Sequence, residues 1–173
     1  MLFRSRAGIP SQLEKLHHHQ PASSAKLLFS PDFRHRNADT VNVPVGEWPL
    51  LTSCDTAVAG GGTGGVPAGI AAARHGANTI IIESQAHLGG VGTEGRIAAY
   101  WFGNRNGFTH EVDIGVDGFG GTIEPGGGKW KVESKQQYWE HTAITAGCRV
   151  YLQHSILAVT MDSGRVGLLL VAG

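Results

Sequence analysis

The sequence predicts an α/β fold in which short parallel strands alternate with helices and a β-hairpin follows. Within residues 55–83, an apolar run, a glycine-dense loop, a helical segment and a second apolar run follow one another. Residues 130–152 repeat the order of helix and short strand. Two apolar runs then flank a turn at residues 162–164. Together these observations predict a parallel sheet with helices packed on it and an antiparallel hairpin.

The first strand–helix–strand unit occupies residues 56–82. Thr56–Ala59 is a short apolar run suited to a buried strand, and Thr79–Ile82 is a second one. Val66–His75 is alanine-rich and helical, and Gly76 ends it. Pro67 falls in the first turn of that helix, where its missing N–H removes only a donor that has no helical partner. This order is the βαβ unit from which parallel sheets are built.

The loop between the first strand and the helix carries the most specific signal. Gly60, Gly62 and Gly65 match G-x-G-x-x-G, the fingerprint of Rossmann-like dinucleotide binding. Gly60 permits a sharp turn with positive φ, Gly62 lets the backbone approach a pyrophosphate, and Gly65 lets the helix pack close to the strands. The N–H groups and dipole at the start of the helix attract phosphates. The predicted phosphate site is the whole run: Gly60, Gly61, Gly62, Thr63, Gly64 and Gly65.

An acidic residue follows at the expected place. Glu83 ends the second strand, about 20 residues beyond the loop, and Ser84 follows it. We predict that Glu83 accepts hydrogen bonds from the ribose hydroxyls of an adenosine, with Ser84 beside it. Its charge repels a 2′-phosphate, so NADP is the least favoured ligand. The alternative is a glycine-rich loop that binds nothing, but the register of strand, helix and acid favours a dinucleotide.

A second glycine cluster separates two classes of dinucleotide-binding protein. Leu88-Gly89-Gly90 follows the acid by a few residues, with Thr93 just beyond. NAD-binding domains have no general need for such a cluster. Flavoproteins with two dinucleotide-binding motifs commonly carry one, because the chain passes back along the pyrophosphate and flavin end. The pattern favours FAD over NAD. An NAD-binding dehydrogenase domain stays the alternative for the ligand, and a flexible loop stays the alternative for the cluster.

The middle of the chain combines aromatic and polar residues. In Ile97–Phe108 the rings could line a ligand pocket and Arg105 could hold a carboxylate, or the rings could be core and Arg105 surface. Both interpretations stay open. His110-Glu111-Val112-Asp113 is not H-E-x-x-H, because Ile occupies position 114. Residues 115–128 are so rich in glycine that we expect a mobile excursion.

The last third predicts a helix, a strand and a hairpin. Trp130–Ala146 is helical, with Gly147 as its C-terminal cap, and Arg149–Leu152 is a strand of the same sheet. Ile156–Met161 and Val166–Val171 form the hairpin. On the helix we expect one apolar face (Val132, Trp139, Ala143, Ala146) and polar positions elsewhere (Glu133, Lys135, Gln136, Glu140).

Composition excludes several classes of function. The formal net charge is zero, so no nucleic-acid partner is expected. No apolar run approaches 18 residues, which predicts no membrane span, and no secretory signal is evident, so a cytoplasmic location is expected. Cys54 and Cys148 form neither a C-x-x-C motif nor a disulfide framework, which fits a reducing compartment, and Cys148 is expected to serve packing. The adjacent His17–His19 point in different directions on a helix, so no metal site is expected.

The first fifty residues differ from the remainder. Gly8 and Gly46 are their only glycines, whereas 26 glycines occur in the whole chain. Ser11–Leu16 could form a helical turn or two, residues 21–30 read as a loop, and Val41–Leu51 could be a strand. We therefore predict an N-terminal extension (1–50) of unclear structure and a nucleotide-binding domain (51–173).

Taken together, these motifs resemble a known family. AVAGGGTGGVPAGIAAARHGANTIIIE, HLGGVGTEG and YWFGNRNGFTHEVDIGV are similar to segments of FAD-dependent oxidoreductases of the glutathione-reductase-like superfamily, in the group that includes heterodisulfide-reductase-subunit-A-like flavoproteins. The resemblance covers roughly residues 52–172. It implies contacts with the pyrophosphate (Gly60, Gly62, Gly65), the ribose (Glu83), the flavin end (Gly89, Gly90, Thr93) and the adenine (the backbone near Ile156).

Two departures from the family qualify this resemblance. Members with iron–sulfur clusters need groups of cysteines, which Cys54 and Cys148 cannot supply. Members are also much longer, with a late strand that closes the sheet, a second glycine motif and a substrate domain. We therefore expect an incomplete domain, from a fragment, a truncated gene model or a split protein.

The leading functional hypothesis is the FAD-binding portion of a flavin-dependent oxidoreductase. Its catalytic residues, small-molecule substrate and electron acceptor are left unassigned. A second hypothesis is an NAD-binding dehydrogenase domain. A third is a truncated, non-catalytic fragment that acts only with a partner chain. An exposed sheet edge would favour self-association or pairing with a missing C-terminal partner.

Overall fold

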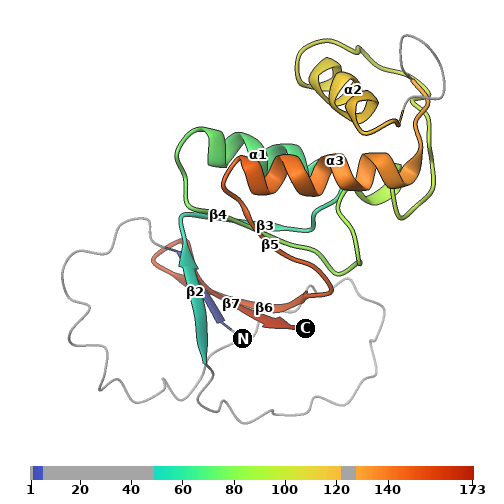
Figure 1. Cartoon of the computed structure of the whole chain (residues 1–173). Coiled ribbons are helices and arrows are strands. Elements are labelled where there is room, and N and C mark those ends of the chain that lie inside the picture. The colour runs from blue at the N-terminus through green and yellow to red at the C-terminus, as the bar shows by residue number, and fades with distance from the viewer. Residues whose placement is uncertain (1, 6–48, 122–127) are drawn as a thin grey trace. The chain divides into compact units, whose positions relative to one another are not determined.

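A computed structural model of the chain describes residues 2–5, 49–121 and 128–173 (Figure 1). The chain divides into two compact units. The α/β unit comprises Cys54–Ser155 and Gly173, and the hairpin unit comprises Met1–Ser53 and Ile156–Ala172. The predicted division at residue 50 stays a prediction.

The α/β unit contains a three-stranded parallel sheet. Its strands are β3 (Thr56–Ala59), β4 (Thr79–Ile82) and β5 (Arg149–Tyr151), in the order β3-β4-β5. Thr56 pairs with Thr79, and Ile80 pairs with Arg149. All four residues of β4 are buried, as expected for a central strand of β-branched residues. The predicted α/β fold with a parallel sheet is confirmed.

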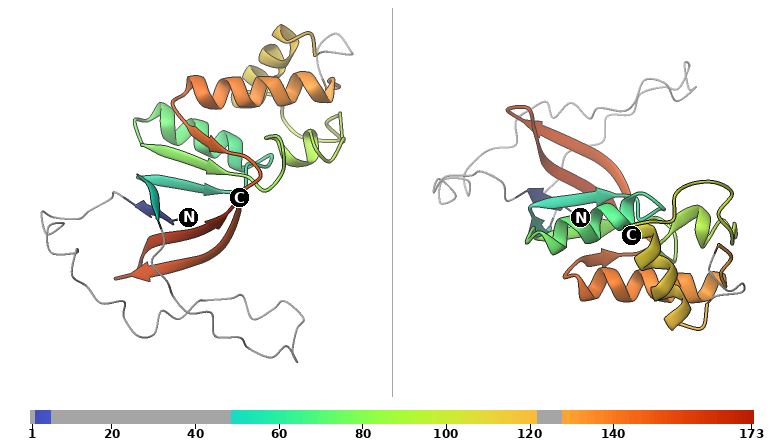
Figure 2. Two further views of the ribbon diagram at one scale, coloured as in Figure 1. Left: turned by 60° about the horizontal axis from the view of Figure 1, so that its bottom comes forward. Right: turned by 90° about the horizontal axis from the view of Figure 1, so that it is seen from above.

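Three helices belong to this unit. They are α1 (Gly65–Arg74), α2 (Phe108–Gly118) and α3 (Val132–Thr145). Helices α1 and α3 lie side by side on one face of the sheet, and α2 packs against α3 (Figures 1 and 2). The core between helices and sheet consists of aliphatic and aromatic side chains, among them Val66, Ile70, Ile81, Leu88, Tyr138, Trp139 and Ala143.

Helix α1 matches its prediction closely. It begins one residue before Val66, and His75 forms its C-terminal cap. Gly76 has a φ of 88°, the left-handed conformation with which helices often end. Helix α3 ends in the same way, because Gly147 has a φ of 97° and its N–H bonds to the carbonyl of Ile144. Both predicted helix ends are confirmed.

Helix α2 corrects one prediction. Gly115–Gly118 was expected to open a mobile excursion but continues the helix to its end. Val112 and Val116, one turn apart, are both buried and anchor it. A Cβ at Gly115 would overlap the ring of Tyr138 on α3. The glycine therefore permits close packing of two helices, which composition alone does not distinguish from loop glycine. Residues 122–127 of the expected excursion lie outside the described residues.

The hairpin unit contains a four-stranded sheet in the order β2-β1-β7-β6. Strand β1 (Leu2–Ser5) pairs antiparallel with β7 (Arg165–Ala172), and Leu2 lies opposite Leu170. The outer strands are β2 (Leu50–Cys54) and β6 (Ser155–Asp162). Strand β1 was not predicted. Of the predicted strand at 41–51, only the last residues are described, and they begin β2.

The predicted hairpin between β6 and β7 is confirmed. Ser163 and Gly164 have φ values of 48° and 80°. Two successive residues with positive φ form the type of turn whose twist suits a two-residue hairpin. The Ser163 hydroxyl donates to the Asp162 carboxylate at 3.0 Å. The expectations for Ser11–Leu16, His17–His19 and residues 21–30 lie outside the described residues.

Both cysteines are buried, and burial raises the pKa of the Cys54 and Cys148 thiols. Because the thiolate is the reactive form, we expect a thiol reagent at pH 7.5 to modify both at least about 100-fold more slowly in the folded chain than in urea. Absorbance of the released chromophore measures both rates. Fast release of one equivalent from the folded chain would contradict this packing.

Candidate functional site

The first glycine loop has the backbone geometry that its fingerprint predicts. Gly60 has a φ of 96°, and its N–H bonds to the carbonyl of Ile82 at 2.8 Å. A Cβ at Gly65 would overlap the carbonyl oxygen of Gly60. The sharp turn at Gly60 and the close packing of helix on strand at Gly65 are thus both confirmed. Gly61 is fully enclosed, because a Cβ there would collide with Leu88.

The outer side of this loop is open. A Cβ at Gly62 or Gly64 would meet no atom within 4 Å. Among the described residues, no acceptor bonds the N–H groups of Gly62, Thr63 or Gly64. These groups precede or begin α1, where N–H groups have no helical acceptor. The loop therefore offers free donors and space at the positive end of a helix, which suits a phosphate group.

Glu83 lies beside the loop with its carboxylate held from three directions. It is 7% exposed, and Oε2 accepts a hydrogen bond from the Gly61 N–H at 2.7 Å. Oε1 accepts from the Gln85 N–H at 2.8 Å and from the Ser84 hydroxyl at 3.1 Å. A carboxylate has about four acceptor positions, so about one remains for a ligand. The acid is fixed at the loop, as the predicted ribose contact requires, while Ser84 contacts the acid itself.

The second glycine cluster packs directly on the first. The Gly89 N–H bonds to the Gly61 carbonyl at 2.8 Å, and the Thr63 hydroxyl bonds to the Gly89 carbonyl at 3.1 Å. A Cβ at Gly90 would lie 2.9 Å from the Cα of Gly62. The predicted phosphate loop and the predicted flavin-end residues therefore form one continuous surface. We call residues 89–93 the second glycine turn; Gly90–Gly92 form a 3-10 helix within it.

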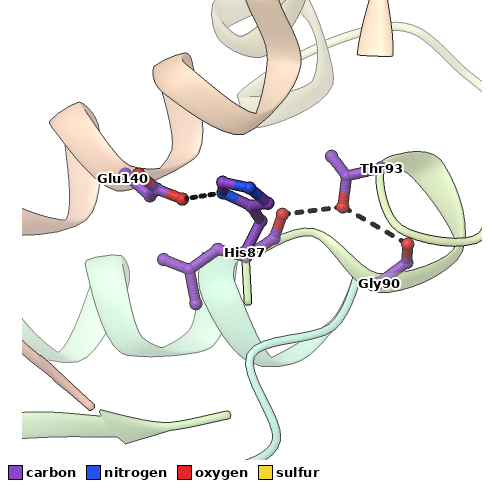
Figure 3. A network of polar contacts seen from close by, with 5 residues as sticks. His87, Gly90, Thr93 and Glu140 are labelled. Carbon is purple, nitrogen blue, oxygen red and sulfur yellow. Dashed lines mark hydrogen bonds and ion pairs between the residues drawn. The ribbon is translucent and has the colours of Figure 1, made fainter. Parts of the chain in front are cut away.

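Thr93 closes the second glycine turn from inside. Its side chain is fully buried, and its hydroxyl lies 2.7 Å from the Leu88 carbonyl and 3.3 Å from that of Gly90 (Figure 3). Because a hydroxyl has one proton to donate, these carbonyls already use it. Its backbone N–H donates to the Gly90 carbonyl at 3.0 Å, and its carbonyl accepts from the Arg96 N–H at 2.9 Å. Thr93 is buried throughout and therefore shapes the turn from within.

Helix α3 supports the second glycine turn through residues that the sequence interpretation did not assign to the site. The Glu140 carboxylate lies 2.8 Å from Nδ1 of His87, just before Leu88 (Figure 3). A Cβ at Gly89, which has a φ of 105°, would lie 2.7 Å from Trp139. Glu140 and Trp139 belong to no recognisable sequence motif, because each contacts a residue some fifty positions away. No local pattern could have identified them.

Lys135 on the same helix corrects a prediction. It was expected on the polar side of α3 but is only 5% exposed. Its Nζ lies 3.2 Å from the centre of the Trp130 ring and 4.9 Å from that of Tyr100. Burial lowers the pKa of the Lys135 ammonium to about 8, opposed by the nearby Asp113 carboxylate. Two aromatic faces make the unexpected position tolerable for a cation.

The segment Ile97–Phe108 follows neither of the two interpretations completely. Tyr100 and Phe108 pack against the core, whereas Trp101 and Phe102 are 88% and 89% exposed. Arg105 forms two hydrogen bonds with Oδ2 of Asp113, at 3.0 and 2.7 Å, so its guanidinium already holds a carboxylate of this chain. Burial and Asp113 raise the pKa of Tyr100 to about 12.

The remaining predicted site residue is in the other unit. Ile156 lies in β6 of the hairpin unit, whereas the glycine loop, Glu83 and the second glycine turn all lie in the α/β unit. In the described ranges, no group of His, Cys, Asp and Glu side chains could hold a metal ion. Nor does any described helix have the length and apolar character to cross a membrane.

A family model described as FAD dependent oxidoreductase matches residues 55–171. No curated protein matches the chain significantly.

Solved structures give weaker similarities. THI4 of Thermovibrio ammonificans is 19% identical over 69% of this chain and 47% of its own, with a TM-score of 0.47. A geranylgeranyl bacteriochlorophyll reductase-like protein of Thermoplasma acidophilum is 25% identical over 65% of this chain and 33% of its own, with a TM-score of 0.46. The chain thus spans less than half the length of either.

Proposed function

The chain belongs to the family of FAD dependent oxidoreductases, and from that membership we propose that its α/β unit holds the pyrophosphate and ribose of FAD. The observation that carries the proposal is the open outer side of the first glycine loop. Space at Gly62, donors without acceptors and the start of α1 occur together there. Anions such as phosphate can accept hydrogen bonds from several N–H donors at a helix start.

The proposed contacts divide between two parts of one surface. The N–H groups of Gly62–Gly64 would bond the pyrophosphate, and the remaining acceptor position of Glu83 would bond a ribose hydroxyl. The second glycine turn would border the flavin end, since Gly90 contacts Gly62. The backbone near Ile156 as the adenine contact stays a proposal, as does the position of Thr93 near the flavin end.

Bound FAD supplies an acceptor for a hydride or electrons, and the protein contributes binding, orientation and electrostatics. We propose an oxidoreductase of the glutathione-reductase-like class, in the group with heterodisulfide-reductase-subunit-A-like proteins, acting in the cytoplasm on a small molecule. The quoted sequence motifs support this placement. The catalytic residues and the electron acceptor stay unassigned. Strand β3 has one neighbour among the described strands, which supports the expectation of self-association or of a partner chain.

Gly62→Ala is expected to weaken FAD binding at least about tenfold while changing the free energy of unfolding by less than about 0.5 kcal/mol. The added methyl group meets nothing in the protein but fills the space proposed for the pyrophosphate. Quenching of flavin fluorescence on titration with the full chain measures affinity, and urea unfolding measures stability.

Gly118→Ala is the matched control, because its Cβ also meets no atom and it lies at the end of α2. It should bind FAD as the original chain does. Equal affinity of the Gly62 variant and this control would refute the proposed phosphate site. Tight NAD binding without FAD binding would instead favour the NAD-binding alternative.

A further inference from the structure

Lys135 is a buried ammonium without a carboxylate partner in the described parts of the chain. The carboxylates of Glu111, Glu140 and Asp113 pair instead with Arg74, His87 and Arg105. A charge removed from water costs free energy unless an opposite charge or strong hydrogen bonds compensate it. The position of Lys135 therefore calls for an explanation beyond packing.

Aromatic rings surround this ammonium on two sides. Trp130 lies 3.2 Å and Tyr100 4.9 Å from Nζ, measured to the ring centres. The negative faces of the rings stabilise a cation without neutralising it. The positive charge can consequently still attract an anion nearby. We call Tyr100, Trp130 and Lys135 the lysine cluster.

The lysine cluster lies directly against the second glycine turn. Trp130 Nε1 donates to the Gly92 carbonyl at 2.8 Å, and a Cβ at Gly92 would lie 3.6 Å from Lys135 Nζ. Gly90 of the same turn contacts Gly62 of the phosphate loop. The second glycine turn thus meets the lysine cluster at Gly92 and the first glycine loop at Gly90.

We propose that Lys135 is a positioning residue whose positive charge, held behind the second glycine turn, strengthens the binding of the FAD pyrophosphate. This inference rests on the proposed function and assigns part of the affinity to a residue outside the glycine motifs. Charges interact strongly where protein rather than water separates them. The turn and its aromatic support exclude water from the side chain of Lys135.

Within the lysine cluster and its surroundings, a change of pH can remove the charge of Lys135 selectively. The charged side chains described around the cluster are Asp113 of α2 and Arg105, which pair with each other. Tyr100, with a pKa raised to about 12, stays neutral below that pH. The pKa of Lys135, lowered by burial to about 8, is the one within reach of mild alkali.

The experiment measures the FAD dissociation constant of the full chain between pH 7 and pH 9.5 for the original chain, Lys135→Arg and Lys135→Met. The original chain should bind FAD about three- to tenfold more weakly at pH 9.5 than at pH 7. Lys135→Arg keeps its charge over this range, so its FAD affinity should fall much less between pH 7 and pH 9.5. Lys135→Met should bind weakly already at pH 7, with the small pH dependence of the arginine variant.

A second readout does not depend on the variants folding equally well. FAD must lower the acid dissociation constant of Lys135 by the same factor by which protonation of Lys135 strengthens FAD binding, because coupling is reciprocal. The pKa of Lys135 must therefore rise when FAD binds. NMR of ¹³C-labelled lysine, with Lys135→Arg identifying the resonance, measures this shift. An unchanged pKa on FAD binding, or equal pH dependence of the original chain and the arginine variant, would overturn the inference. Absence of FAD binding at pH 7 in the original chain would instead overturn the proposed function.

Discussion

Gly65→Ala is expected to lower the free energy of unfolding by about 3 kcal/mol or more and to abolish FAD binding. A Cβ at this position overlaps the Gly60 carbonyl oxygen and lies 3.2 Å from Val58 Cγ1. Gly60 cannot move aside, because its N–H is bonded to Ile82 on the neighbouring strand. Helix α1 would have to leave the sheet, which would also displace the phosphate loop. Urea unfolding followed by circular dichroism gives the loss of stability.

Gly64→Ala is the matched control for stability. Gly64 has helical backbone angles and open space around its Cβ position, so alanine there should change stability by less than about 0.5 kcal/mol. Similar unfolding midpoints for the two variants would show that the helix does not approach the strand as closely as described.

Lys135→Met is expected to stabilise the protein by about 1–2 kcal/mol at pH 7, although it removes a charged group. The pKa of Lys135 falls from 10.5 to about 8 on folding, a difference equivalent to about 3 kcal/mol. Loss of the contacts with Trp130 and Tyr100 offsets about 1–2 kcal/mol of this gain. Methionine has a similar length and flexibility and needs no hydration.

The pH dependence of this gain has a definite sign. Between about pH 8 and pH 10.5 the unfolded chain binds the lysine proton and the folded chain does not, so the original chain gains stability as the pH rises. The free-energy cost of burying the charged Lys135 is complete below about pH 8 and has vanished above about pH 10.5. The advantage of the methionine variant should therefore fade across that window. A constant difference between the two unfolding free energies from pH 7 to 10.5 would contradict it.

The charge of Lys135 has two opposing effects, one on stability and one on ligand binding. Its charge destabilises the folded chain by desolvation, and the same charge would strengthen the binding of an anion at the second glycine turn. A residue that costs stability and serves a ligand is common at functional sites. Measured together, the unfolding and FAD titrations of Lys135→Met would show both effects in one variant.

Much of the fold could be predicted because its signals are local. The apolar runs that form β3 and β4, the alanine-rich α1 and the turn at Ser163-Gly164 each specify a backbone conformation within a few residues. The same holds for the glycine fingerprint, since positive φ at Gly60 follows from the sharp turn between strand and helix. Local signals do not identify which strands, distant in the sequence, pair with each other. Strand β1 pairs with β7 across most of the chain.

Glycine shows where local interpretation fails. Gly115 and Gly118 lie in one glycine-rich run, yet the first permits two helices to pack and the second faces open space. Burial of Lys135 was missed for a similar reason. Its helix has polar residues on several sides, and only the position of Trp130 and Tyr100 in space makes one of them an interior position.

The sequence by itself determined the βαβ unit, the first glycine loop, the acid after β4 and the family, because each depends on backbone preferences or spacings confined to a short stretch. The tertiary structure alone decided that the two glycine clusters form one surface and that α3 supports it with Glu140, Trp139 and Lys135. Those contacts join residues tens of positions apart. These contacts form only when the helices pack on the sheet in one particular arrangement. Local backbone preferences do not specify that arrangement.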